Sequence, residues 1–367
     1  MRLIDSIEIS YFRSVYSAKL KDVGDLNILV GSNDCGKSNV LRALNLFFNG
    51  NPSPNEQFDF LEDVSHIRQD EAREAKGRLT IWIKITFNNI EKWRTLPEKF
   101  TIKRVWNRYS DTSEISFDVD TRPANITKFL NKIDFHYVPA VKHTSTYSFY
   151  LRKLYETISQ DPEFDLIAPS EELSRSINQA VSELSNQVEN TIGIKSQINI
   201  PTDFGTLFER LNFETMNGEH RIPLTKRGDG IQSRHIPHIL EHISENNKKL
   251  NIWGYEEPEN SLELANSFDL AGQFRNTFSK NNQVFVTSHS PAFYGINDEN
   301  TKKYYIRKIN ENGRRSISSI SKFESNTAPD ESLGIAALIA DRSRSLYLEL
   351  EEKNRKLQNF QMFLDQF

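Results

Sequence analysis

Apolar residues in the first third of the chain follow a pattern typical of strands. From Leu79 to Phe87 every second residue is apolar, which is the period of a half-buried strand. A helix is expected at Asn39–Phe48, because the run ends at Asn49-Gly50, a common helix stop. The other strands predicted here are Ile7–Val15, Asn27–Val30, Ile102–Trp106, Ile115–Val119 and Ile133–Val138. Such a cluster of strands indicates an antiparallel β section after the helix.

The middle of the chain has helical periodicity instead. Six apolar residues from Leu173 to Ile192 are spaced 4, 4, 3, 4 and 4 apart, which places them on one face of a helix. The helix would begin near Pro169-Ser170 and extend about 30 Å. Its apolar stripe would either pack on its own domain or form an arm that dimerises. The roughly three or four clean heptads that would favour a coiled coil are not present.

Strands and helices alternate in the final third, which favours a parallel sheet. Leu250–Tyr255 and Gln283–Thr287 are short apolar runs typical of buried strands. The other elements expected here are helices at Ile231–Ile243 and Ser261–Phe278, a strand at Tyr304–Ile309, a turn at Asn312-Gly313 and a charged helix at about Arg342–Phe367. The whole pattern predicts an α/β fold.

Composition narrows the class of protein. A chain of 367 residues fits two domains, or one large domain with an insertion. No apolar run approaches the roughly 18 residues of a membrane-spanning helix, and the charged N-terminal segment does not resemble a signal peptide, so we expect a cytoplasmic protein. The single cysteine, Cys35, excludes an internal disulfide and fits a reducing compartment. A net charge of −4 argues against coating nucleic acid through bulk charge.

A phosphate-binding loop is the strongest chemical signal. The segment Gly31-Ser32-Asn33-Asp34-Cys35-Gly36-Lys37-Ser38 matches Gly-x-x-x-x-Gly-Lys-Ser/Thr, between a predicted strand and a predicted helix. Its backbone N–H groups would cradle the phosphates of ATP, with the helix N-terminus adding positive potential. Lys37 would pair with the β- and γ-phosphates, and Ser38 would offer its hydroxyl to Mg²⁺. We interpret Cys35 as a small residue tolerated in the loop rather than a redox switch.

Two carboxylates follow the apolar strand Leu250–Tyr255. Phosphoryl transfer beside a phosphate loop needs one carboxylate for the hydrated Mg²⁺ and one for the attacking water. We expect Glu256 to take the metal role and Glu257 to orient or deprotonate the water.

A histidine and a glycine-rich turn complete the candidate site. His289 follows the strand Gln283–Thr287, at the strand end where ligands gather in α/β sheets, and could bond a γ-phosphate oxygen and sense its loss. The turn that contains Gly228, Gly230 and Ser233 opens a predicted helix 29 residues before Glu257. It is either a second phosphate seat or simple helix capping.

In their order along the chain, the four motifs resemble the ATP-binding-cassette (ABC) type ATPase head shared by SMC proteins, RecF and the overcoming-lysogenization-defect (OLD) family. GSNDCGKSN resembles the Walker A motif, RGDGIQS the signature, YEEPE the Walker B motif with its catalytic glutamate, and TSHSP the switch-histidine loop. The opening Ile7–Ser14 is similar to the start of these heads, and Phe135–Ala140 to a Tyr-Ile/Val-Pro-Ala segment of OLD-like ATPases. Glu256 departs from the Asp of many relatives, and the signature lacks its leading Ser-Gly pair.

The resemblance implies an α/β fold of ABC-type head, with a mixed and parallel sheet, an antiparallel β section and a helical insertion. The head would comprise 1–140 and 222–325, the insertion 141–221 and a C-terminal helical tail 326–367. The nucleotide-binding residues would be Arg13, Asn33, Asp34, Gly36, Lys37, Ser38, Asn39, Gly228, Gly230 and Ser233. ATP and Mg²⁺ are the expected cofactors. A homodimer or higher oligomer would sandwich ATP between one subunit's P-loop, Glu257 and His289 and the other's signature turn.

The family's nuclease motif is missing from the final part of the sequence. The 78 residues after His289 hold no Asp-x-Asp pair of a Toprim nuclease, and the insertion is too short for SMC arms. The chain thus resembles a stand-alone OLD-like ATPase, relatives of which often accompany a separate nuclease or toxin in bacterial anti-phage systems.

Three functions follow as hypotheses: an ATPase switch or sensor that controls such an effector, a RecF-like ATPase that clamps DNA in repair or recombination, and a scaffold that binds ATP slowly. A basic segment, 302–322, with Lys302, Lys303, Arg314 and Arg315, would meet phosphates or form a solvated strand pair. The C-terminal helix would dock a partner or pack back on the head.

Overall fold

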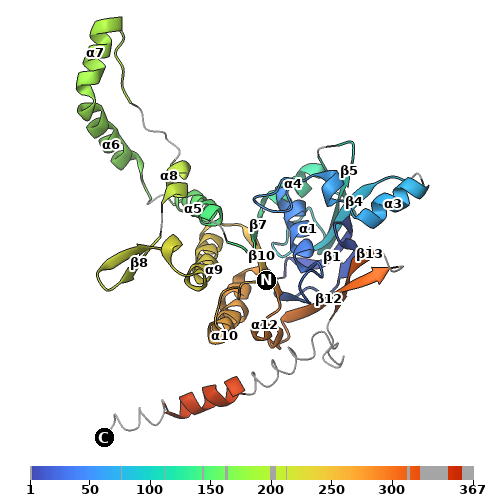
Figure 1. The fold of residues 1–367 in the computed structure, drawn as a ribbon. Coiled ribbons are helices and arrows are strands. Elements are labelled where there is room, and N and C mark those ends of the chain that lie inside the picture. Colours follow the sequence, from blue (N-terminus) through green and yellow to red (C-terminus); the bar gives the residue numbers. More distant parts are fainter. Residues whose placement is uncertain are drawn as a thin grey trace. The chain divides into compact units, whose positions relative to one another are not determined.

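The structure, a computed structural model, describes residues 2–75, 77–110, 112–142, 144–161, 164–198, 204–211, 213–311, 315–322 and 346–357. Its contacts divide the chain into two compact units (Figure 1). The first unit combines 1–141 with 249–367, and the second consists of 142–248.

The antiparallel section of the first unit is a five-stranded sheet of order β2-β1-β4-β5-β6. Its strands are β1 (Ile4–Phe12), β2 (Val15–Leu20), β4 (Thr80–Asn88), β5 (Lys99–Asn107) and β6 (Glu114–Phe117). Buried and partly exposed residues alternate along the whole of β4, because successive side chains of a strand point to opposite faces. The strand predicted from its period of two is confirmed.

A second, six-stranded sheet has the order β13-β12-β3-β11-β10-β7. Its strands are β3 (Leu26–Val30), β7 (Ile133–Val138), β10 (Leu250–Glu256), β11 (Gln283–Ser288), β12 (Thr301–Glu311) and β13 (Arg315–Lys322). All neighbours pair in parallel except β12 and β13. Every residue of β3, β10 and β11 is buried, as is usual for central strands of a parallel sheet.

Helix α1 (Lys37–Asn49) contacts both sheets of the first unit. It packs against β1 of one sheet and against β7, β10 and β11 of the other. Phe47 of the helix therefore shares one hydrophobic core with Ile83 of the first sheet and Ile252 of the second. The helix ends at Gly50, whose φ of 82° is a left-handed conformation that glycine adopts without strain. The predicted helix and its stop are confirmed.

Two strand predictions were wrong in detail. The single strand expected at Ile7–Val15 is two strands, because the chain reverses at Arg13-Ser14, where Arg13 has a φ of 49°. The reversal contains neither glycine nor proline, so the sequence carries a weak turn signal there. The strand at Ile133–Val138 exists as β7, but it pairs in parallel with β10 instead of joining the antiparallel section.

Short helices complete the described part of the first unit. They are α2 (Phe60–Asp63), α3 (His66–Ala75), α4 (Pro123–Asn131), α10 (Leu264–Gln273), the π-helical turn η2 (Phe274–Phe278), α11 (Ser279–Asn281) and α12 (Pro291–Tyr294). The helix expected at Ser261–Phe278 thus begins three residues later and changes to π-helix at Phe274.

The C-terminal helix is described over 346–357. The ring of Tyr347 stacks on Phe268 of α10 at a centroid distance of 5.7 Å, so this end of the helix packs back on its own unit. The rest of the helix expected at Arg342–Phe367, and the turn expected at Asn312-Gly313, lie outside the described residues.

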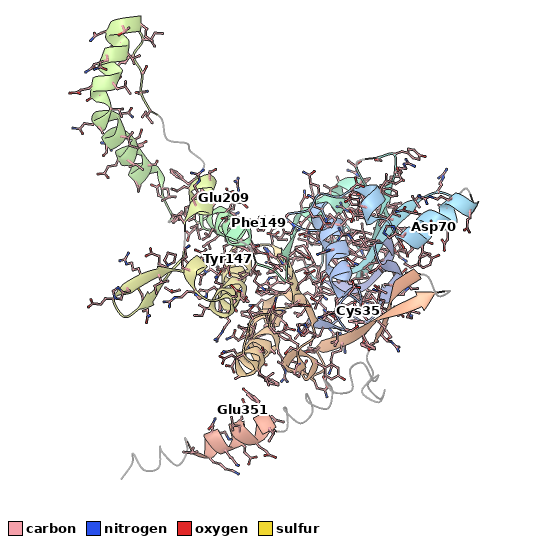
Figure 2. The ribbon with its side chains drawn as sticks, viewed as in Figure 1. Cys35, Asp70, Tyr147, Phe149, Glu209 and Glu351 are labelled. Atoms are coloured by element: carbon pink, nitrogen blue, oxygen red, sulfur yellow. The ribbon has the colours of Figure 1, made fainter. Side chains whose placement is uncertain are left out.

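The second unit is mainly helical. Its elements are α5 (Thr144–Ile158), α6 (Ile167–Ala180), α7 (Ser182–Ile192), α8 (Gly205–Arg210), β8 (Glu214–Asn217), β9 (His220–Pro223), the 3-10 turn η1 (Leu224–Lys226) and α9 (Asp229–Asn246). Helix α5 packs on α8 and α9, and an ion pair of 2.8 Å joins Arg152 of α5 to Glu209 of α8, which Figure 2 labels. The helix predicted at Ile231–Ile243 is confirmed as α9.

The helix predicted to carry the apolar stripe differs from the prediction in its continuity and in its burial. One helix was expected from Leu173 to Ile192, but the helix breaks at Val181 into α6 and α7, which follow one another in an extended segment (Figure 1). Leu173, Leu184 and Ile192 are 54%, 60% and 62% exposed, so these residues do not pack on their own domain. A dimerising arm stays a prediction. In the described ranges, the helices are too short or too polar to cross a bilayer.

The signature turn at 228–233 falls in the second unit, whereas the motif order groups it with the head. The second unit combines 142–221, assigned to the insertion, with 222–248, assigned to the head. The proposed limits of 141–221 for the insertion therefore stay a prediction.

Candidate active site

The carboxyl ends of three neighbouring parallel strands, β3, β11 and β10, meet at one edge of the second sheet. Register pairs Val30 of β3 with Ser288 of β11, and Thr287 of β11 with Glu256 of β10. The P-loop follows β3, Glu256 ends β10 with Glu257 directly after it, and His289 follows β11. Parallel strands of a doubly wound sheet bind ligands at this edge. The fold therefore brings three of the four predicted motifs together.

Lys37 is the first residue of α1 and is 5% exposed. Its ammonium group donates hydrogen bonds to the carbonyl oxygens of Gly31, at 3.0 Å, and Ser32, at 2.9 Å. The side chain thus lies back across its own loop. This position holds a positive charge inside the curve of the loop, where phosphate oxygens would be bound.

Gly36 has a conformation and an environment that exclude other residues. Its φ is 96°, in the left-handed region, and a Cβ built on it would lie 2.0 Å from the hydroxyl of Ser318 and 2.6 Å from that of Ser14. Ser318 of β13 donates to the carbonyl of Cys35 at 2.8 Å. Asn39 donates to the hydroxyl of Ser14 at 2.8 Å. The P-loop is therefore braced by the β1–β2 turn and by β13.

The other loop residues divide into exposed and buried. Asn33 and Asp34 are exposed, and Ser38 is partly exposed as the second residue of α1. Lys308 binds Asp34 at 2.6 Å and lowers the pKa of this carboxyl. Cys35 is buried, and its burial raises the pKa of the thiol (Figure 2). Such a thiol is little ionised and hence weakly reactive, which fits the interpretation of Cys35 as a packed small residue.

Glu256 is held by groups from two other elements. It is 3% exposed, and the hydroxyl of Tyr137 in β7 donates to its Oε1 at 2.6 Å. The backbone N–H of Ala140 donates to Oε2 at 3.2 Å, and Arg42 of α1 lies 3.9 Å from Oε1. Burial, and then the negative charge of Glu256, raise the pKa of Tyr137 well above its usual value. The phenol therefore stays a hydrogen-bond donor and fixes the carboxylate.

Glu257 and His289 face each other across the ends of β10 and β11. The backbone of Glu257 has a φ of 41°, and its N–H donates to the carbonyl of Thr287 at 2.9 Å. Its Oε1 lies 3.6 Å from Nδ1 of His289. The Glu257 carboxylate raises the pKa of His289, and Glu259 adds to this effect, whereas burial and Lys37 oppose it. The neighbouring carboxylates therefore favour the protonated ring of His289.

The remaining predicted nucleotide-binding residues have other partners in this structure. Arg13 forms ion pairs with Asp63, at 2.7 Å, and with Glu56. Gly228 precedes α9, and its carbonyl accepts from two N–H groups of the first helical turn, as in helix capping. Gly230 and Ser233 are in α9, and Ser233 is buried. These three belong to the second unit, and the P-loop belongs to the first.

Sequence reasoning missed four residues that contact the site. Tyr137 and Glu259 lie inside segments that the resemblance singled out, but without a role. The spacing of Arg42 within α1 gave no hint of its approach to Glu256. Ser318 is 283 residues from Cys35, its partner in the loop, so no local pattern could have identified it.

Sequence comparisons cover all four motifs. The family model described as an AAA ATPase domain matches residues 1–149 and 144–294. A protein of Helicobacter pylori named ATP/GTP phosphatase is 24% identical over 339 residues, which cover 81% of this chain and 88% of that protein. An uncharacterized protein of Methanocaldococcus jannaschii is 41% identical over 49 residues, which cover 13% of this chain and 15% of that protein.

Solved structures show the same fold. An Smc head bound to the C-winged helix domain of ScpA gives a TM-score of 0.53 at 15% identity, covering 88% of this chain and 98% of that one. An Smc head with an extended coiled coil, bound to the C-terminal domain of ScpA derived from Pyrococcus furiosus, gives 0.52 at 14%, covering 94% and 100%. The expected α/β head of ABC type is confirmed.

Proposed function

Because this chain belongs to the AAA ATPase domain family and is a P-loop ATPase, we propose that it acts as a nucleotide-gated dimeric switch. Two copies would close over ATP, and hydrolysis would release them. The observation that carries the proposal is the grouping of Lys37, Glu257 and His289 at one sheet edge.

In this proposal the P-loop binds the triphosphate. The N–H groups at 33–39 face the phosphates, and Lys37 exchanges its carbonyl partners for phosphate oxygens, which form stronger, charge-assisted bonds. Arg13, Asn33, Asp34 and Asn39 contribute contacts at the rim.

The oxygen ligands of the site fit Mg²⁺. Each oxygen of Glu256 accepts one described hydrogen bond, and a carboxylate has further lone pairs for a hydrated cation. No group of three or more His, Cys, Asp or Glu side chains suited to a metal occurs in the described ranges, so Ser38 and Glu256 would share Mg²⁺ with phosphates and water. The ion would neutralise charge that develops on the phosphates.

Glu257 and His289 serve hydrolysis in this proposal. The Glu257 carboxylate orients the attacking water and accepts its proton. His289 is 51% exposed, so its ring can donate to a γ-phosphate oxygen and respond when that phosphate leaves. Gly228, Gly230 and Ser233 of a second copy would close the pocket from the opposite side, where the helix N-terminus favours anions.

Native mass tests the switch directly. We expect a monomer without nucleotide and a dimer or higher oligomer with ATP and Mg²⁺, measured by light scattering at matched concentrations. ATPase activity per chain should fall on dilution below the dimer's dissociation constant. A monomer that hydrolyses ATP equally fast at every dilution would contradict the shared site.

A separate effector completes the first proposal. The Smc heads of the same fold were solved with domains of ScpA bound, which supports a protein partner for this chain. The resemblance to stand-alone OLD-like ATPases suggests a nuclease or toxin in anti-phage defence. Co-purification of a non-ATPase subunit from the native host would support this role, and its absence under ATP would contradict it.

A second candidate function, DNA binding, is favoured by a basic cleft in the first unit. The cleft has a volume of about 860 Å³ and lies between α3 and the strands β4 to β6. Arg73, Arg78 and Arg108 line it, and Tyr109 at its rim is 92% exposed. Arg73 is 3.5 Å from Asp70, labelled in Figure 2, whereas Arg78 and Arg108 have no ion-pair partner among the described residues.

The basic segment expected at 302–322 is less available for DNA than the arginine cleft. Lys302 is 4.0 Å from Asp22, Lys303 donates to the carbonyl of Tyr294 at 3.0 Å, and Lys308 binds Asp34. Arg314 lies outside the described residues. Because these lysines already have partners, the arginine cleft is the better candidate for phosphates of DNA.

We expect the double substitution Arg78→Ser and Arg108→Ser to weaken DNA binding about 10-fold. The slope of log affinity against log salt concentration should become shallower by the equivalent of about two phosphate contacts. Fluorescence anisotropy with a labelled 30-base-pair duplex, across salt concentrations, measures both. The matched control is Lys302→Ser with Lys303→Ser, which should have little effect. Equal loss in both variants, or no binding by the wild type, would contradict the cleft.

A further inference from the structure

A third acidic residue, Glu259, lies beside the proposed catalytic pair. It is two residues beyond Glu257, and its side chain is 5% exposed. Its Oε1 accepts three hydrogen bonds from the switch loop: from the hydroxyl of Ser288 at 2.6 Å, and from the N–H groups of His289 at 3.1 Å and Ser290 at 3.2 Å. Glu259 therefore fixes the backbone that carries His289.

The second oxygen of Glu259 has no such partner. Its Oε2 is buried and has no hydrogen bond from any described residue. Leaving a buried carboxylate oxygen unpaired costs free energy, so its presence calls for a physical reason. The ring of His289 lies beside the same carboxylate, with its Nδ1 3.8 Å from Oε1.

The His289 ring lies near two carboxylates, those of Glu257 and Glu259. Its Nδ1 is 3.6 Å from Glu257 and 3.8 Å from Glu259, and both distances exceed a good hydrogen bond. A small rotation of the ring would form one bond or the other. A bond to Glu257 would occupy the group proposed to bind water, whereas a bond to Glu259 would leave Glu257 free.

We infer that Glu259 is the positioning residue of His289: it holds the switch loop through Oε1 and accepts Nδ1–H of the ring, so that Nε2–H faces the γ-phosphate and Glu257 is released to the water. A carboxylate that accepts Nδ1–H stabilises the imidazolium, as in catalytic triads, and the imidazolium also carries a proton on Nε2 that can be donated. Because this inference deepens the proposed function, it rests on the roles given there to Glu257 and His289.

Glu259→Gln tests the inference, because glutamine keeps an oxygen for the three loop donors but loses the negative charge. We expect kcat of the full chain to fall about 10- to 100-fold, as for other groups that orient a functional histidine, with the Kd for ATP changed less than about two-fold. The His289 pKa should fall, since Glu259 is among the groups that raise it, alongside Glu257 and against Lys37. NMR titration of the His289 ring measures this shift.

The control is Glu263→Gln, which makes the same change at an exposed position four residues further along the chain. It should leave kcat and the His289 pKa unchanged. Wild-type kcat in Glu259→Gln would overturn the inference. A reduced kcat with an unchanged His289 pKa would also overturn it, because that result indicates a purely structural role.

A second variant covers the case in which Glu259→Gln does not fold. Ser288→Ala removes one of the three bonds to Oε1, and kcat should fall about three-fold at unchanged ATP affinity. Unchanged kcat in Ser288→Ala would then overturn the inference. The proposed function has its own test: if Lys37 and Glu257 variants behave as proposed, a negative result at Glu259 rejects the positioning role alone.

Discussion

Lys37→Ala should abolish measurable ATP binding, raising the Kd by about 100-fold or more. A charge-assisted hydrogen bond is worth about 1.5–3 kcal/mol, and Lys37 is placed to make more than one to the phosphates. The loop also loses the bonds that join Lys37 to the carbonyls of Gly31 and Ser32. Isothermal titration calorimetry with ATP and Mg²⁺ measures the effect.

The matched control for Lys37→Ala is Lys308→Ala. This change neutralises a lysine that touches the same loop through Asp34 but is 47% exposed. Its effect on the Kd should stay within about three-fold, because an exposed ion pair contributes at most about 1 kcal/mol. Equal affinity in Lys37→Ala and the wild type would exclude the loop as the nucleotide site.

Glu257→Gln should retain ATP binding and trap an ATP-bound dimer. The amide cannot accept a proton from water, so we expect kcat to fall about 10²- to 10⁴-fold. ATP would then stay between the two copies, and light scattering after removal of free nucleotide should still detect the dimer. Because the phosphate-binding residues are intact, the Kd should change little.

A double variant makes this experiment specific. Lys37→Ala combined with Glu257→Gln should be monomeric with ATP, because the trap needs bound nucleotide. Glu263→Gln, an exposed change in the same segment, should behave as the wild type. If Glu257→Gln hydrolyses ATP at the wild-type rate, another group activates the water.

The sequence allowed prediction of those parts of the site that depend on local pattern. A phosphate loop between a strand and a helix, and polar residues directly after apolar runs, identify themselves within ten residues or so. Parallel pairing then brings Lys37, Glu256 and His289 to one edge, as the alternation of strands and helices predicted.

The remaining features depend on contacts between distant segments or on weak local signals. The bond from Tyr137 to Glu256 spans 119 residues, and no spacing rule connects them. The reversal at Arg13-Ser14 lacks glycine and proline, and the break at Val181 interrupts an otherwise regular helical pattern. Tertiary contacts, such as the 2.7 Å bond from the N–H of Arg13 to the carbonyl of Asp63, hold the reversal. Helix α7 has no buried residue, so the described residues give no packing reason for the break at Val181.

The brace between β13 and the P-loop has a consequence for biosynthesis. Ser318 bonds to the carbonyl of Cys35 and to the hydroxyl of Ser14, and β12 separates β3 from β13 in the sheet. A nascent chain that has left the ribosome only as far as residue 300 contains every motif for ATP yet lacks the strands that shape the loop. Nucleotide capture would therefore wait until β12 and β13 have been synthesised, which protects the incomplete head from pairing prematurely.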